Sequence, residues 1–432
     1  MADRCRPVQV LGAQGTKAVS APQGTFGARI LELADRLAAH SDLPGALSCT
    51  YLTPAHCASA KELAQWMQAA GMAASIDGVG NVVGRYPAAQ ATNRTLIVGS
   101  HYDTVVDAGK YDGRLGILTG LVVIDHLNRS GRRLPFAVEL IGFAEEEGLR
   151  FSASYIGSTA VAGSFDRGLL ARRDRDGISL ADAISATGFD PAGIPKLARP
   201  RQDLAGYLEV HIEQGPVLLQ EGLPLGVVTA IAGNCRFWLT VSGQAGHAGT
   251  VPMGLRHDAV AAAAEIVLAV ERRCSNVATL VGTVGRIEVP GGATNVIAGR
   301  CELSLDIRAG DDATRDAAVA DVRAEIDAIE RRRGVMVEIK EMQRNGAVAC
   351  SARVQSLFAD AIARTGTTPR FLPSGAGHDA VNFGGITDTG MLFVRCGNGG
   401  VSHSPRETIT AEDADLGARV LLDVLEHYED QG

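Results

Sequence analysis

Short apolar segments that end in histidine or acidic residues recur along the chain, and they constrain its fold more than any other feature. Thr95–His101 and Phe136–Phe143 each have the pattern of a buried strand, and a helical pattern runs between them from about Gly116 to Asn128. Tyr207–His211 is a further strand of the same kind. Strand, helix and strand at this spacing predict an α/β fold with a mainly parallel sheet covered by helices.

Two helices are predicted before the first of these strands. Phe26–Ala39 carries apolar residues at helical spacing, and Ser59–Ala70 is followed by Gly71, a residue that favours the end of a helix. The first two dozen residues show little pattern.

Residues 215–344 have a different pattern, which predicts a separate α+β (βαββαβ) domain. Its expected strands are Arg236–Ser242, Leu280–Glu288, Arg300–Arg308 and Val335–Met342. One expected helix, Asp258–Arg273, follows the first strand, and a second, with Val319, Val322, Ile326 and Ile329 on one stripe, precedes the last strand. This order can form a four-stranded sheet covered by two helices. We therefore expect residues 215–344 to be inserted into a larger α/β domain formed by residues 1–214 and 345–432.

Composition excludes several classes of protein. The net charge of −8 argues against a nucleic-acid groove, which needs clustered lysine and arginine. No apolar segment is long and uninterrupted enough to span a bilayer, and the N-terminus, which carries Asp3, Arg4 and Arg6, lacks an apolar run long enough for the core of a secretory signal. The eight cysteines are scattered without a CxxC pair, so we expect reduced thiols and a cytoplasmic protein.

The first candidate site follows the strand that ends at His101. His101 and Asp103 are two residues apart, so an extended chain would point both to one side. This spacing suits an imidazole that binds a metal and a carboxylate that holds its other nitrogen. Asp112, in Tyr111-Asp-Gly-Arg-Leu-Gly116, is close enough along the chain to supply an oxygen ligand. Taken alone, an HxD pair is more often part of a surface loop.

Three adjacent carboxylates, Glu145, Glu146 and Glu147, follow the next strand. They repel one another unless cations neutralise them, although a solvated acidic loop is the simpler interpretation. His211 and His403 each follow another apolar run, and either one alone would more often be structural. Together these clusters indicate three imidazoles and two carboxylates at successive strand ends, enough to hold two divalent ions that share one carboxylate.

With these clusters in place, the sequence resembles the M20 metallopeptidase-like amidohydrolases, and within them the hydantoinase/carbamoylase branch. That branch includes N-carbamoyl-L-amino acid hydrolases, allantoate amidohydrolases and β-ureidopropionases. The resemblance extends from about Phe26 onwards. Its motifs are SHYDT, YDGRLG, EEEGLRF, HIEQG, GQAGHAGTVPM, ATNVI, LDIR and SGAGHDA.

The resemblance implies a role for each clustered residue. One metal ion would be bound by His101, Asp112 and His211, and the other by Asp112, Glu147 and His403, so that Asp112 lies between the two. Glu146 would be the general base and Asp103 the partner of His101, although spacing alone does not separate Glu145 from Glu146. The ions would be Zn²⁺ or Mn²⁺, with Co²⁺ or Ni²⁺ also compatible. His211 favours the carbamoylase branch, because carboxypeptidases and aminoacylases of the family usually carry Asp or Glu there.

The resemblance also implies substrate contacts. Gln214 would form a hydrogen bond with the substrate, and His247 would face the developing oxyanion. Asn295 and Arg308 would hold the substrate carboxylate, and His378 would line the same pocket. Without the resemblance, His247, Asn295 and Arg308 would be assigned to an ordinary turn, loop and strand end.

The function implied is metal-dependent hydrolysis of the ureido C–N bond of N-carbamoyl-L-amino acids or related ureido acids (allantoate, N-carbamoyl-β-alanine), with release of ammonia and carbon dioxide. An M20 aminoacylase or dipeptidase acting on N-acyl or peptide bonds is the alternative, and a catalytically silent binding protein is a second. The resemblance further implies a homodimer formed through the inserted domain, with His247 reaching the partner's active site, and a cis peptide bond between Asp112 and Gly113.

Overall fold

Four parallel strands form the centre of the larger sheet, in the order β4 (Ala137–Phe143), β3 (Thr95–His101), β5 (Leu204–Ile212) and β16 (Thr389–Val394). Every residue in these four strands is buried. Strands covered on both faces need apolar side chains in both directions, which explains why their sequences are mostly apolar and do not alternate. The computed structural model describes residues 25–431, and its α/β fold with a mainly parallel central sheet confirms the predicted fold class.

Further strands, most of them antiparallel to their neighbours, extend the sheet on both sides to nine strands. On one side β2 (Val82–Tyr86) pairs with β4, and β1 (Ala73–Ile76) pairs with β2. On the other side β6 (Leu225–Ile231) pairs with β16, and β14 (Val348–Ala349) pairs with β6. Strand β15 (Phe371–Ser374) also pairs with β6.

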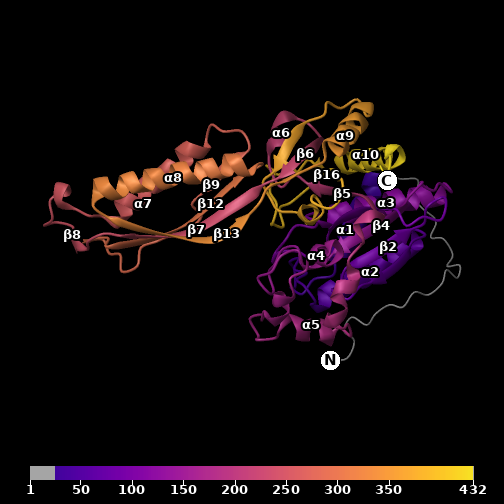
Figure 1. Cartoon of the computed structure of the whole chain (residues 1–432), viewed down its shortest axis with the longest axis horizontal. Helices are drawn as coiled ribbons and strands as arrows, with labels where there is room; N and C mark the ends of the chain where they lie inside the picture. The colour runs from indigo at the N-terminus through magenta and orange to yellow at the C-terminus, as the bar shows by residue number, and fades with distance from the viewer. Residues whose placement is uncertain (1–24, 432) are drawn as a thin grey trace. The chain divides into compact units, whose positions relative to one another are not determined.

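Helices α1 (Phe26–Ala38), α3 (Arg114–Arg129) and α10 (Ala411–His427) pack against one another, and α3 lies against β3 and β5 (Figure 1). Helix α2 (Pro54–Ala69) packs on β1 and β2, and α9 (Ala352–Arg364) packs on β16. The shorter helices of this part are α4 (Ile156–Ala162), α5 (Leu180–Ala186), α6 (Val217–Glu221) and the 3₁₀ turns η1 (Arg167–Ala171), η2 (Pro191–Leu197), η3 (Arg201–Asp203) and η5 (Asp379–Asn382).

A second, antiparallel sheet contains β10 (Ile287–Glu288), β12 (Arg300–Ala309), β7 (Gly233–Ser242) and β13 (Met336–Asn345) in that order, with β9 (Leu280–Thr283) paired to β12. Burial alternates along β7 and β12, and α7 (Ala259–Cys274) and α8 (Asp312–Arg333) lie side by side against these two strands (Figure 1). The sheet has five strands where the sequence predicted four, because Leu280–Glu288 forms two strands rather than one. A separate ribbon pairs β8 (Gly246–His247) with β11 (Val296–Ile297), and η4 (Met253–Leu255) follows β8.

The chain divides into two compact units. The second unit contains Ala230–Ala349 and Pro373–Gly377, and the first contains the remaining described residues. The change of unit therefore comes after most of β6, a strand of the larger sheet, rather than at residue 215 where the sequence pattern changes. Each unit has its own apolar core: Phe358 and Leu392 belong to the first, and Phe237 and Ile266 to the second.

Among residues 25–431, no helix has both the length and the apolar character needed to cross a membrane. Six cysteines of this part are free thiols, as expected, but Cys57 is in a disulfide bond, which corrects the expectation of fully reduced thiols. The expectations for the first two dozen residues lie outside the described part of the chain.

Candidate metal centre

The predicted ligands lie at one edge of the larger sheet because parallel strands carry their carboxyl ends to the same edge. His101 is the last residue of β3, and His211 is the second-last residue of β5. The three glutamates follow the end of β4, and Asp112 lies just before α3. His403 lies in the segment between β16 and α10.

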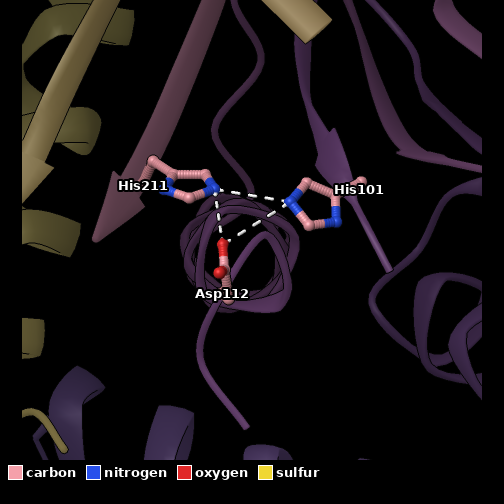
Figure 2. Close-up of side chains that lie close together, drawn as sticks. All are labelled: His101, Asp112 and His211. Carbon is pink, nitrogen blue, oxygen red and sulfur yellow. Dashed lines mark hydrogen bonds and ion pairs between the residues drawn. The ribbon is translucent and has the colours of Figure 1, made fainter. Parts of the chain in front are cut away.

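His101, Asp112 and His211 form a group in which all three side chains are buried (Figure 2). The Nε2 atoms of the two histidines are 3.5 Å apart. Asp112 Oδ1 lies 3.7 Å from the Nε2 atom of His101 and 3.2 Å from that of His211. One nitrogen or oxygen atom from each of the three residues lies within 4.8 Å of the others. The spacing leaves room for an ion between three ligand atoms.

Asp112, Glu147 and His403 form a second group, in which one ligand atom from each residue again lies within 4.8 Å of the others. His403 Nε2 is 3.1 Å from Asp112 Oδ2 and 3.4 Å from Glu147 Oε1. Asp112 therefore faces two histidines with one carboxylate oxygen and the third histidine with the other. The structure thus brings together all five side chains that the sequence proposed as ligands.

Backbone carbonyl groups orient the two buried imidazoles. His211 Nδ1 is 2.9 Å from the carbonyl oxygen of Ile212, and His101 Nδ1 is 3.2 Å from that of Asp103. A carbonyl oxygen only accepts hydrogen bonds, so each Nδ1 carries a proton, and each Nε2, on the side of Asp112, is the nitrogen that would bind a metal ion. This is the tautomer that a metal-binding histidine needs.

Asp103 lies next to His101 and also supports the centre in a second way. Its carboxylate lies 3.7 Å from His101 Nδ1, farther than its own carbonyl oxygen. The carboxylate accepts hydrogen bonds from the backbone N–H groups of Glu146 at 3.1 Å and Glu147 at 3.2 Å. Asp103 therefore fixes the segment that carries two candidate functional carboxylates.

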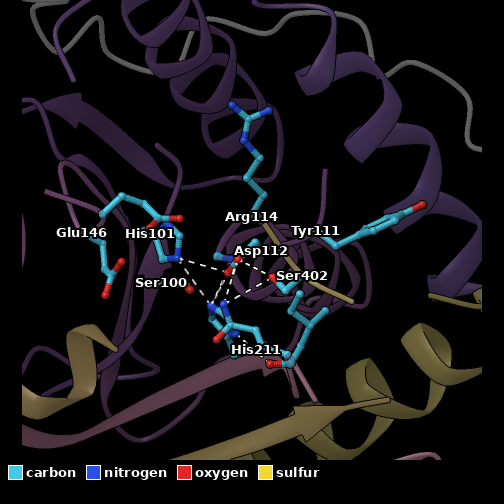
Figure 3. Close-up of polar contacts among 12 residues, drawn as sticks. Ser100, His101, Tyr111, Asp112, Arg114, Glu146, His211 and Ser402 are labelled. Carbon is cyan, nitrogen blue, oxygen red and sulfur yellow. Dashed lines mark hydrogen bonds and ion pairs between the residues drawn. The ribbon is translucent and has the colours of Figure 1, made fainter. Parts of the chain in front are cut away.

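The three glutamates have different environments. Glu145 has φ of +58° and accepts the backbone N–H of Arg150 with its carboxylate, so its side chain stabilises the loop. Glu146 belongs with His101 and Glu147 to a third group of converging polar atoms, and it lies on the His101 side of Asp112 (Figure 3). This arrangement favours Glu146 over Glu145 as the general base.

Burial and neighbouring charges shift the pKa values of three of the candidate ligands. Burial and the neighbouring Asp112 carboxylate raise the pKa of Glu147 to about 7, although His101 and His403 oppose the shift. A hydrogen bond to Asp112 raises the pKa of His403 to about 8. For Asp112, burial is outweighed by the three nearby histidines, which hold its pKa well below the usual range. Several buried carboxylates so close together indicate a site that cations stabilise.

The residues present fit divalent metal ions. Asp112 Oδ1 is buried and has no hydrogen-bond partner. At Gly113, a Cβ atom would lie 2.4 Å from the His101 ring, so only glycine leaves the space beside that ligand. Imidazole nitrogens and carboxylate oxygens together suit Zn²⁺, Mn²⁺, Co²⁺ and Ni²⁺.

The expected cis peptide bond at Asp112–Gly113 is wrong for this structure, because residues 25–431 contain no cis peptide bond. Gly113 turns the chain with φ of +64° and ψ of −52° instead, a conformation that a residue without a Cβ atom adopts easily.

Gln214 and His378, the two predicted substrate contacts of the first unit, both lie at the centre. Gln214 Nε2 donates to Asp112 Oδ2 at 2.8 Å. The His378 ring is buried against that of His211, with centroids 4.4 Å apart. Gln214 thus contacts a candidate ligand directly, a role that the sequence did not suggest.

The other predicted substrate contacts belong to the second unit. His247 and Asn295 are adjacent, because His247 pairs with Val296 and the Ala248 N–H donates to the Asn295 carbonyl oxygen. Gly249 N–H donates to His247 Nδ1 at 3.1 Å, so the proton of this exposed ring is on Nε2. Arg308 forms a two-point contact with Asp306, at 3.1 Å and 2.8 Å, and donates to the Gly375 carbonyl oxygen. Its guanidinium group is therefore already partnered.

Sequence reasoning missed Ser402 and Glu407. Ser402 Oγ lies 2.7 Å from Asp112 Oδ2, and Glu407 accepts the backbone N–H groups of Tyr111 and Asp112 (Figure 3 shows Ser402 beside Asp112). The available signal was their place in Ser402-His-Ser-Pro-Arg-Glu407, the segment that contains His403.

Comparison with known proteins gives one consistent result. The family model described as peptidase family M20/M25/M40 matches residues 97–427. The chain is 41% identical to an N-carbamoyl-L-amino acid amidohydrolase of Geobacillus stearothermophilus, over 84% of this chain and 88% of that protein. It is 39% identical to allantoate deiminase 2 of Glycine max, over 90% and 86%. A solved amidase of the hydantoinase/carbamoylase family from Burkholderia multivorans matches with a TM-score of 0.87 and 32% identity, covering 93% of this chain and 97% of that one.

Proposed function

The chain belongs to peptidase family M20/M25/M40, a family of metal-dependent hydrolases, and we propose that it hydrolyses the ureido C–N bond of N-carbamoyl-L-amino acids or related ureido acids. Allantoate and N-carbamoyl-β-alanine are the related acids. The products are ammonia, carbon dioxide and the amino compound. The observation that carries this proposal is the convergence of three imidazole Nε2 atoms on the carboxylate of Asp112, with Glu147 and Glu146 beside them.

Two divalent ions fit the two ligand groups, one at His101, Asp112 and His211 and the other at Asp112, Glu147 and His403. We propose Zn²⁺ or Mn²⁺, with Co²⁺ or Ni²⁺ as possible replacements. The chemistry that such ions supply when bound is polarisation of the substrate carbonyl group and a lowered pKa for the attacking water.

The protein's own residues move the protons. A Glu146 carboxylate oxygen accepts a proton as water adds to the carbamoyl carbon, and it then delivers the proton to the departing nitrogen. The C–N bond to the terminal amino group breaks, so ammonia leaves. The remaining carbamate loses carbon dioxide. His247 Nε2–H donates a hydrogen bond to the oxyanion that develops during the addition.

Further parts of the proposal follow the family resemblance. Asn295 and Arg308 hold the substrate carboxylate, for which Arg308 must exchange its contact with Asp306. Gln214 and His378 line the substrate pocket. The protein is a cytoplasmic homodimer formed through the second unit, and His247 completes the site of the partner.

A panel of substrates tests the proposal. The metal-free protein is loaded separately with Zn²⁺, Mn²⁺, Co²⁺ or Ni²⁺, and ammonia release is measured with N-carbamoyl-L-amino acids, N-carbamoyl-β-alanine and allantoate. N-acetyl amino acids and dipeptides serve as controls for the aminoacylase and dipeptidase alternative. Ammonia release from ureido substrates alone supports the proposal. Cleavage of the control substrates alone, or absence of bound divalent ions, contradicts it.

A further inference from the structure

Glu407 is a buried carboxylate that takes no part in the chemistry proposed above. It is 2% exposed. Its Oε1 atom accepts two backbone hydrogen bonds, from Tyr111 N–H at 2.7 Å and from Asp112 N–H at 3.1 Å. These N–H groups belong to the turn that presents the Asp112 side chain, so Glu407 fixes the main chain at the residue that the two ligand groups share.

The other oxygen of Glu407 reaches the Asp112 side chain through a hydroxyl group. Ser402 Oγ lies 3.1 Å from Glu407 Oε2 and 2.7 Å from Asp112 Oδ2. The hydroxyl has one proton, which it donates to both carboxylates in a three-centre hydrogen bond, with the shorter distance to Asp112. Ser402 therefore holds Asp112 Oδ2 in place, which leaves Oδ1 directed at His101 and His211.

The loop that contains Gly109 packs closely against the Glu407 side chain. A Cβ atom at Gly109 would lie 2.4 Å from the Glu407 carboxyl group. Gly109 does not have a positive φ, so its backbone conformation does not require glycine. The missing side chain is needed for space, and it allows the carboxylate to approach the amides of residues 111 and 112.

From these contacts we infer that Glu407 is a positioning residue for the metal centre. It joins the segment that carries His403 to the turn that carries Asp112, and it sets both the backbone and, through Ser402, the carboxylate orientation of Asp112. Partners that orient metal ligands typically contribute 10–100-fold to metal affinity. The inference rests on the proposed function, because it assumes that Asp112 binds divalent ions.

Metal affinity of purified variants tests this role without measuring activity. Dissociation constants are obtained by competition with a chelator for the wild type, Glu407→Ala, Glu407→Gln and Ser402→Ala. Glu407→Ala should weaken binding by about 10–100-fold. Glu407→Gln should remain close to the wild type, because its amide oxygen can accept both N–H groups while its NH₂ donates to Ser402.

The double variant Glu407→Ala/Ser402→Ala distinguishes a positioning role of Glu407 from a general loss of folding stability. Glu407 and Ser402 act along one chain of hydrogen bonds, so Ser402→Ala should add little to the effect of Glu407→Ala on metal affinity. Glu139→Ala is the matched control, since Glu139 is also buried, in β4, and is paired with Arg85 and Arg199. It should lower the unfolding temperature and leave metal affinity unchanged.

Unchanged metal affinity in Glu407→Ala would overturn the inference, as would equal losses in Glu407→Ala and Glu139→Ala. A wild-type protein that binds no divalent ion would overturn the proposed function itself, and the inference with it. If Glu407→Ala does not fold, the Ser402→Ala variant carries the same test, with weaker metal binding expected.

Discussion

At the scale of single residues, the acidic run after β4 shows how adjacent identical side chains acquire different roles. The positive φ of Glu145 turns the chain, and its carboxylate is used by a backbone amide of the loop. The next residue, Glu146, converges with His101 and Glu147. Asp103 accepts the backbone N–H groups of Glu146 and Glu147 and so fixes this segment, although its own negative charge helps to raise the pKa values of both glutamates.

A pair of conservative variants tests the assignment of the base. Glu146→Gln keeps the shape of the side chain but cannot accept a proton, so kcat should fall by about 10²–10⁴-fold. Glu145→Gln retains an oxygen that accepts the Arg150 N–H and should keep most of the activity. Steady-state kinetics with the metal content checked in both proteins measures the effect. Greater loss in Glu145→Gln would reverse the assignment.

His56 in α2 gives a prediction for stability at low pH. Burial and the charges of Arg114 and Arg150 lower its pKa to about 3, against 6.5 for an ordinary histidine. Between these values the unfolded chain binds a proton that the folded protein does not, so this residue makes stability fall as pH falls. At pH 5 the contribution is about 2 kcal/mol, from 1.36 kcal/mol for each pKa unit.

Urea unfolding of the metal-free proteins at pH 8 and pH 5 measures this contribution. His56→Gln has no group that titrates in this range, so the wild type should lose about 2 kcal/mol more stability than the variant between the two values. Equal losses would show that His56 is protonated in the folded protein.

At the scale of elements, α3 connects the sheet to the metal centre. The helix starts two residues after Asp112, and it packs on β3 and β5. Gly116 permits this contact, because a Cβ atom there would lie 2.2 Å from the carbonyl oxygen of Val210 in β5. The position of Asp112 therefore depends on how closely α3 approaches the sheet.

Gly116→Ala sets two effects against each other. Alanine favours a helix over glycine by about 1 kcal/mol, but overpacking costs about 1–3 kcal/mol. The clashing atom belongs to the backbone of a central strand and cannot rotate away, so overpacking should prevail. The variant should unfold at lower urea concentration and bind metal more weakly.

Gly193→Ala is the control for this change, because nothing lies within 4 Å of a Cβ atom at that position. It should behave like the wild type in both measurements. A stabilised Gly116→Ala would mean that α3 can move away from the sheet at little cost.

At the scale of the whole molecule, the two units divide the proposed machinery. All five candidate ligands and Glu146 belong to the first unit, whereas His247, Asn295 and Arg308 belong to the second. In the proposed homodimer, each site combines Glu146 of one chain with His247 of the other.

Mixing two inactive variants tests this division. Glu146→Ala lacks the base, and His247→Ala lacks an oxyanion donor that contributes about 10²–10³-fold to turnover. Random pairing after joint unfolding and refolding gives about half heterodimers, each with one intact site of two, so activity should return to about a quarter of the wild type.

Refolding each variant alone is the control and should restore nothing. If the mixture also remains inactive although exchange of subunits is demonstrated by tagged chains, His247 does not act across a subunit interface.

Much of the fold could be predicted from the sequence, because the periodicity of apolar residues is local. It predicted α1 to within one residue at its C-terminal end and placed the strands that carry His101 and His211. It placed the start of α2 at Ser59, although the helix begins at Pro54 after the capping residue Thr53. That first turn was missed because it depends on Pro at the first helical position and a cap, not on apolar spacing.

The sequence by itself also determined that the candidate ligands meet, since histidines and carboxylates at the carboxyl ends of parallel strands share one edge of the sheet. Only the tertiary structure decided which groups touch. Ser402 and Asp112 are 290 positions apart, and Asp103 is 43 from Glu146. Hydrogen bonds act over about 3 Å, and no local pattern specifies such distances between segments. The separation of Glu145 from Glu146, and the contacts of Glu407, therefore emerge only when the chain is folded.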